Sequence, residues 1–89
     1  MSEHKQTKKV VARLARIEGH VAAVKRMVEE GRSCTDVLVQ IAAVRSALDK
    51  AAKLLLSDHM EHCVLDSLRD GDAEKHVAEL REALERFIL

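Results

Sequence analysis

Apolar residues in the first third of the chain recur at alternating spacings of four and three, which places them on one face of an α-helix. These residues are Val10, Leu14, Ile17, Val21, Val24 and Val28. The pattern predicts a helix over about residues 6 to 30. Gly31 follows, and glycine commonly ends a helix because it adopts a left-handed backbone at little cost.

A second apolar stripe follows Ser33, whose hydroxyl can cap a helix, with Asp36 three residues later. It comprises Val37, Ile41, Val44, Leu48, Ala51 and Leu55, and the same spacing then reaches His59 and either His62 or Cys63. The first helix breaker is Gly71, so the pattern predicts one long helix of about 55 Å. Asp72 can cap a third helix, whose apolar residues are Ala73, Val77, Leu80, Leu84 and Phe87 or Ile88.

The composition excludes a β-rich fold. The 89 residues include no Pro, three Gly and one aromatic residue, whereas sheets depend on aromatic and β-branched pairs and on Gly- or Pro-rich turns. A chain of this length forms one small domain. We therefore predict a single all-α domain over residues 1–89, with three helices and a long central one.

The long central helix also predicts an oligomer. The two shorter helices cannot cover its full length, so a monomer would leave much of the apolar stripe in water. Two copies that pack their first and second helices together would form an antiparallel four-helix bundle, with the third helix left to cover an end or make another interface.

No part of the sequence predicts a membrane segment or a secretion signal. There is no run of about 18 apolar residues, and the charged start of the chain lacks a following apolar region. We therefore expect a cytoplasmic protein that makes no membrane contact. In a reducing cytoplasm Cys34 and Cys63 are expected to be thiols rather than a structural disulfide.

Charge is distributed unevenly although the formal net charge is zero. Residues 1–26 carry seven basic side chains against two acidic ones, and the compensating acidic excess lies after residue 53. This asymmetry predicts contact with a polyanion. One interpretation is contact with double-stranded DNA, recognised through its backbone and shape because no helix-turn-helix and no stacking aromatic is evident, and the alternative is a solvated helix face. The candidate phosphate contacts are Lys8, Lys9, Arg13, Arg16, Lys50 and Lys53.

Three side chains of the predicted central helix suggest a metal site. His59 and Cys63 lie one turn apart, whereas Cys34 is 25 residues before His59, or about 37 Å along a straight helix. An antiparallel second copy would bring its Cys34 to them. Two thiolates and one imidazole suit three-coordinate Cu(I), whereas Zn(II) would require a fourth ligand. The alternative is that these residues only pack in the core.

The sequence resembles the copper-sensing operon repressor family over nearly its whole length. The resemblance lies in the Arg-Leu-Ala-Arg-Ile-Glu-Gly-His run at 13–20, the run from Cys34 to Val44, and the His-x-x-x-Cys at 59–63. It implies a flat tetramer, built from two dimers, that binds operator DNA when metal-free and releases it on Cu(I) binding, so that copper efflux or storage genes are derepressed. It also implies Cys34, His59 and Cys63 as copper ligands and Glu79 as the relay between His59 and the DNA-binding state.

Other inducers and roles remain as alternatives. Relatives that sense nickel or cobalt have an additional N-terminal His ligand, and His4 lies in about that region. A persulfide or formaldehyde sensor of the same fold would use Cys34 and Cys63, and a helical scaffold would sense nothing. Ser33 stands where copper sensors often have Tyr. The remaining histidines, His20, His62 and His76, are expected at the surface or in an interface. No Gly-rich phosphate loop or paired-carboxylate pocket favours an enzyme.

Overall fold

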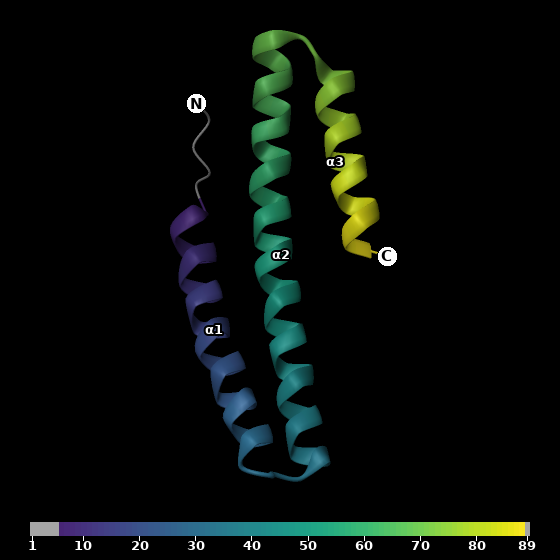
Figure 1. Cartoon of the computed structure of the whole chain (residues 1–89). Coiled ribbons are helices and arrows are strands. Elements are labelled where there is room, and N and C mark those ends of the chain that lie inside the picture. Colours follow the sequence, from purple (N-terminus) through teal and green to yellow (C-terminus); the bar gives the residue numbers. More distant parts are fainter. Residues whose placement is uncertain (1–5, 89) are drawn as a thin grey trace. The chain divides into compact units, whose positions relative to one another are not determined.

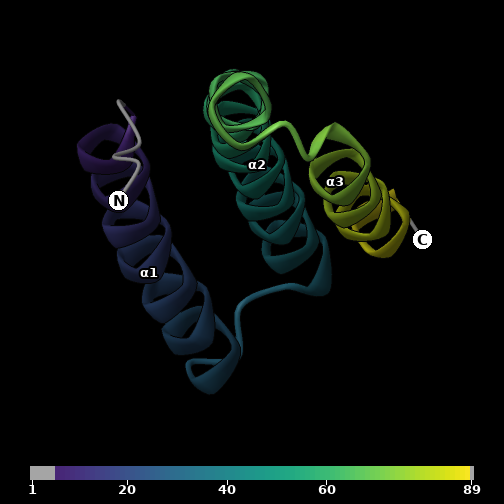
Figure 2. The ribbon, with the colours of Figure 1, turned by 90° about the horizontal axis from the view of Figure 1, so that it is seen from above.

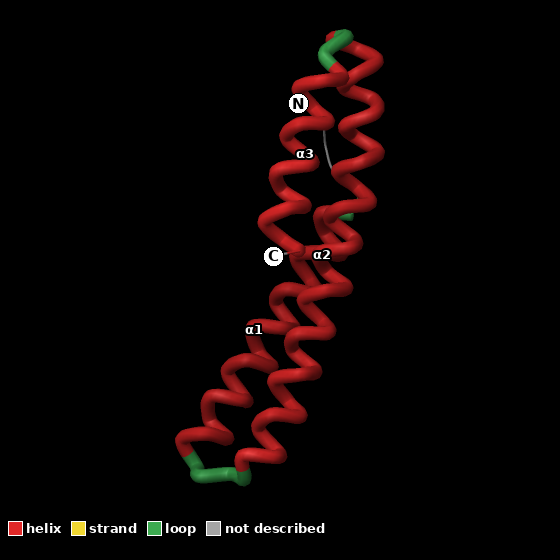
Figure 3. The backbone as a smooth tube through the Cα atoms, turned by 90° about the vertical axis from the view of Figure 1, so that its right-hand side faces the viewer, coloured by secondary structure: helices red, strands yellow, loops and turns green. Residues whose placement is uncertain are grey.

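The computed structural model describes residues 6–88, and these residues form three helices and no strand. The helices are α1 (Thr7–Glu29), α2 (Cys34–Asp70) and α3 (Ala73–Ile88), joined by two short connections (Figures 1 and 3). The all-α prediction, including the long central helix, is confirmed. None of the described helices has the length and apolar character needed to span a membrane.

Local side-chain and backbone chemistry sets the helix ends. Gly31 has φ +72°, and the Gly31 and Arg32 N–H groups donate to the carbonyls of Val28 and Met27, as in a Schellman motif that ends α1. The Ser33 hydroxyl caps α2 by accepting from the N–H of Asp36 at 3.2 Å. These contacts reproduce the boundaries expected from the sequence to within one residue.

The described chain divides into two compact units, the first of which contains α1 and α2 through Leu55. Here α1 runs antiparallel to α2 (Figure 1). Val10, Ile17 and Val24 of α1 are buried, and so is Ala51 of α2. These α1 residues recur every seven positions, so they form only half of the predicted stripe.

The other half of the stripe is exposed. Large apolar side chains of this unit that remain open to solvent include Leu14, Val21, Val28, Ile41, Leu48 and Leu55. A four-residue step from a buried position in α1 therefore leads to an exposed one. A groove of about 280 Å³ runs between the helices and is lined by Val21, Val24, Lys25, Ile41 and Val44. Such a continuous apolar surface is typical of a face that another chain covers.

The second unit comprises α2 from Leu56 onward and α3, which follows after a tight turn (Figure 2). Asp72 caps α3 by accepting from the N–H of Lys75 at 3.3 Å, as the sequence predicted. Leu80 and Leu84 of α3 are half-buried, whereas Val77 and Phe87 are exposed. The buried positions of α2 in this unit are polar or sulfur-containing, namely Asp58, His62 and Cys63.

Candidate metal centre and basic surface

The three proposed metal ligands lie on α2 in different environments. Cys34 is the first residue of the helix and is exposed, and Cys63 is buried at 8% exposure. Both cysteines are free thiols. His59 is exposed one turn before Cys63, so the imidazole and the thiol project from the same helical face.

The described chain does not gather a complete site by itself. Across residues 6–88, no three His, Cys, Asp or Glu side chains are placed to hold one metal ion together. His59 and Cys63 are neighbours near one end of α2, whereas Cys34 lies at the opposite end of the same helix. The donor chemistry nevertheless fits Cu(I), because free thiols and an imidazole are ligands that this ion prefers. His4, the candidate for an additional nickel ligand, lies outside the described residues.

A buried polar pair on α2 corrects the expectation for His62. This residue was expected at the surface or in an interface, but it is 7% exposed within the chain, and Asp58 is only 2% exposed. The Nδ1 atom of His62 lies 3.0 Å from the Asp58 carbonyl oxygen and 3.5 Å from its Oδ1. Asp58 directly precedes His59 and His62 directly precedes Cys63, so the pair lies beside the proposed ligands on the same stretch of helix.

The seven-residue spacing of covered positions in α2 is a sequence signal for this buried pair. Positions 37, 44 and 51 of α2 are among its half-buried or buried residues, and the same seven-residue step reaches Asp58. A carboxylate in that register must be paired when it is buried, because desolvation of an unpaired charge is costly. The histidine one turn later, His62, supplies such a partner.

The other two histidines each make a specific contact. His20 of α1 is half-buried, with its Nε2 at 2.8 Å from Gln40 Oε1 of α2. His76 of α3 pairs with Asp70 at the end of α2, with Nε2 at 2.9 Å from Oδ2. Glu79, the predicted relay, is exposed on α3 three residues after His76, in the same unit as His59 and Cys63.

The predicted DNA-contacting side chains are all exposed and all belong to the first unit. They are Lys8, Lys9, Arg13, Arg16, Lys50 and Lys53. Lys9, Arg13 and Arg16 follow a spacing of four and three, so they share one face of α1. Within the described part of the chain, none of the six is engaged in an ion pair with a carboxylate. Their charges therefore face solvent.

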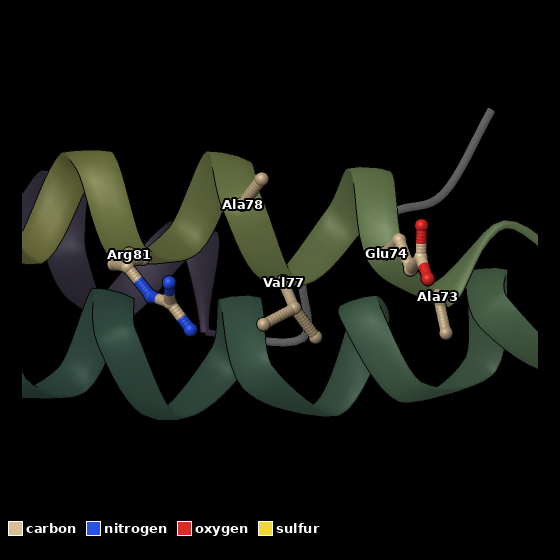
Figure 4. A pocket seen from close by; sticks show the side chains of 5 residues that line it. All are labelled: Ala73, Glu74, Val77, Ala78 and Arg81. Carbon is tan, nitrogen blue, oxygen red and sulfur yellow. The ribbon is translucent and has the colours of Figure 1, made fainter.

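A second hollow, of about 310 Å³, lies on α3 and contains none of the predicted site residues. It is lined by Ala73, Glu74, Val77, Ala78 and Arg81 (Figure 4). All five residues come from one helix, so this is an open surface depression rather than a binding cleft.

Fold and site together define a helical protein that carries a candidate set of metal ligands and a basic surface. The family model described as "Metal-sensitive transcriptional repressor" matches residues 6–86. The chain belongs to this family and is a metal-sensitive transcriptional repressor, not an enzyme.

Several relatives match over most of their length. The copper-sensing transcriptional repressor CsoR of Bacillus subtilis (strain 168) is 44% identical, over 94% of this chain and 86% of the relative. The solved structure of the copper-sensing repressor CsoR with Cu(I) from Geobacillus thermodenitrificans NG80-2 is 38% identical with a TM-score of 0.89, over 100% of this chain and 94% of that chain. The structure of the nickel-responsive transcriptional regulator InrS is 49% identical with a TM-score of 0.81, over 98% of each chain.

Proposed function

We propose that this repressor responds to Cu(I), which binds Cys34 of one subunit together with His59 and Cys63 of another. The observation that carries this proposal is the ligand set itself: two free cysteines and one exposed histidine, with His59 and Cys63 one turn apart on a single helix. A set of two thiolates and an imidazole suits a soft monovalent ion of low coordination number. Relatives named as copper sensors support the choice.

The exposed apolar residues of α1 and α2 support the formation of a dimer. The exposed half-stripes of α1 and α2 and the groove beside Ile41 would be covered by a second copy in an antiparallel four-helix bundle. In this arrangement the exposed Cys34 of one copy approaches the far end of α2 in the other. Two such dimers would form the flat tetramer, whose basic α1 faces would bind double-stranded operator DNA in the cytoplasm.

Regulation requires that Cu(I) favours the conformation that binds DNA poorly, because a ligand shifts an equilibrium only through its different affinities for two states. By linkage, operator DNA must then weaken metal binding by the same factor. A site shared by two subunits can couple Cu(I) binding to DNA binding. Metal binding would move one α2 helix relative to the other and so change the spacing of the basic residues that contact DNA.

Nickel is a second candidate inducer, supported by the similarity to the nickel-responsive InrS. The two metals differ in what they require: Ni(II) favours a four-ligand tetragonal set, which Cys34, His59 and Cys63 do not complete.

An anaerobic titration separates the two candidates. The protein would be bound to its operator, and the fraction of bound DNA would be followed while Cu(I) or Ni(II) is added. We expect one equivalent of Cu(I) per subunit to lower operator affinity by about 5- to 150-fold, the range of typical allosteric coupling, with a smaller effect of Ni(II). A larger response to Ni(II), or no response to either metal, would overturn the copper assignment.

Arg13→Ala should weaken operator binding and reduce its salt dependence. Each phosphate neutralised by a basic side chain contributes about −0.9 to the slope of log affinity against log salt, so loss of one contact per subunit flattens that slope. Binding at a series of salt concentrations measures it. The matched control is Arg86→Ala, which removes an exposed arginine of α3 that pairs with Glu82. An operator affinity independent of salt in the wild type would exclude the electrostatic interface.

A further inference from the structure

One carboxylate at the end of α2 is bonded to both the turn and α3. Asp70 is the last residue of α2, and its Oδ1 accepts from the N–H of Asp72 at 2.8 Å. Its Oδ2 lies 2.9 Å from Nε2 of His76, four residues into α3. The two oxygens of Asp70 therefore hold the turn and the following helix at once.

The backbone of the turn is arranged to permit this contact. Gly71 has φ +72°, a left-handed conformation that a residue with Cβ adopts with strain, and its N–H donates to the Ser67 carbonyl at 2.9 Å. The chain thus reverses within two residues, and α3 begins close to the end of α2. The His76 side chain is only 17% exposed, whereas that of Asp70 is 52% exposed. The ring is mostly shielded, and its carboxylate partner remains in contact with water.

The charges around the ring favour its protonated form. The hydrogen bond that His76 donates to the Asp70 carboxylate raises the pKa of His76 above its ordinary value, and Asp66 of α2 and Glu79 of α3 add to the effect. The pKa of Asp70 is lowered, first by the N–H of Asp72 and then by His76, with Lys75 as the nearby cation. These two shifts widen the pH range in which the imidazolium and the carboxylate coexist.

The sign of the resulting pH dependence follows from these directions. A histidine whose pKa is raised in the folded state contributes its full stabilisation below the unfolded value of about 6.5 and loses it as the pH rises through the folded value. A carboxylate whose pKa is lowered contributes above about 3.9 and loses its contribution as the pH falls. The contact is strongest in mildly acidic solution and weakens as the pH rises through the raised pKa of His76.

We propose that Asp70 and His76 form a pH-dependent latch, which holds the start of α3 on the end of α2 and loosens when the His76 ring loses its proton. The neutral ring can still donate a hydrogen bond to the Asp70 carboxylate, but the attraction between two opposite charges is lost. The latch uses none of the proposed metal ligands. Because Glu79 lies three residues after His76, the latch also constrains the helix that carries the proposed relay, a consequence that rests on the proposed function.

Amide hydrogen exchange of the full-length, metal-free protein tests the latch. Protection of α3 would be measured at about pH 6 and about pH 8, on either side of the range in which histidine titrates, and corrected for intrinsic exchange rates. In the wild type we expect α3 protection to fall about two- to fivefold at the higher pH, as the loss of an exposed ion pair allows, whereas α1 protection stays constant. Asp70→Asn should show the lower protection at both pH values.

A control variant and a direct titration of His76 complete the test. Glu82→Gln removes a carboxylate from another exposed ion pair of α3, with Arg86, and should retain the wild-type response. The titration of the His76 ring, followed by nuclear magnetic resonance, should have a midpoint above about 6.5 in the wild type and a lower one in Asp70→Asn. A midpoint at or below the ordinary value, or an unchanged pH response of α3 in Asp70→Asn, would overturn the proposal. Metal binding plays no part in either measurement.

Discussion

Cys34→Ala is expected to lower Cu(I) affinity by more than about 100-fold. Loss of a residue that only orients a metal ligand typically costs 10- to 100-fold, so the loss of a thiolate ligand should cost more. Because Cys34 is exposed at the first residue of α2, the substitution removes no buried contact. Cys63→Ala should have the same effect on binding, with an additional cost in stability because Cys63 is buried. Competition with a Cu(I) chelator under anaerobic conditions measures both.

A mixture of the two variants distinguishes a site shared between subunits from a site within one chain. When Cys34→Ala and Cys63→Ala subunits are unfolded together and refolded, each mixed dimer contains one intact Cys34 opposite one intact His59 and Cys63. High-affinity binding should then return at one site per mixed dimer. No recovery would exclude the shared site, and unaltered binding by the double cysteine variant would exclude these ligands altogether.

Met60→Ala is the matched control for the ligand variants. Met60 lies between His59 and Cys63 in sequence and is half-exposed, so its thioether is the nearest alternative sulfur donor. Thioethers are weak ligands by comparison with thiolates, and this variant should bind Cu(I) as the wild type does.

Glu79→Ala should retain most of the Cu(I) affinity but lose the effect of Cu(I) on DNA binding. If the Glu79 carboxylate accepts a hydrogen bond from the ring nitrogen of His59 that does not bind metal, it couples the ligand to α3. Typical coupling energies of about 1 to 3 kcal/mol correspond to about 5- to 150-fold in operator affinity. The measurement is operator affinity with and without one equivalent of Cu(I), which should differ little in the variant.

Glu85→Ala provides the matched control for the relay. Glu85 is also an exposed acid of α3, so its replacement changes the net charge and the attraction to DNA by the same amount. This variant should respond to Cu(I) fully. A full response in Glu79→Ala as well would exclude Glu79 as the relay and leave displacement of α2 as the route of coupling.

Much of the fold could be predicted from the sequence because it depends on neighbours along the chain. The end of α1, both ends of α2 and the start of α3 follow from Gly31, Ser33, Gly71 and Asp72, whose backbone freedom or side-chain oxygens act within a few residues. The candidate ligands could also be named, since a residue such as His59 lies one helical turn from Cys63 wherever the helix is placed. Within residues 6–88 no group of three ligands that includes Cys34 forms, so in the proposed site a second copy supplies this cysteine.

The sequence by itself therefore determined the helices, their caps and the residue types available to a metal and to DNA. The tertiary structure decided which half of each apolar stripe is covered: Val10, Ile17 and Val24 are buried, whereas Leu14 and Val21 are exposed. It also decided that Asp58 and His62 are buried and that His76 reaches Asp70 across the turn. The physical reason is that a helical period specifies a face, but burial and pairing depend on what packs against that face.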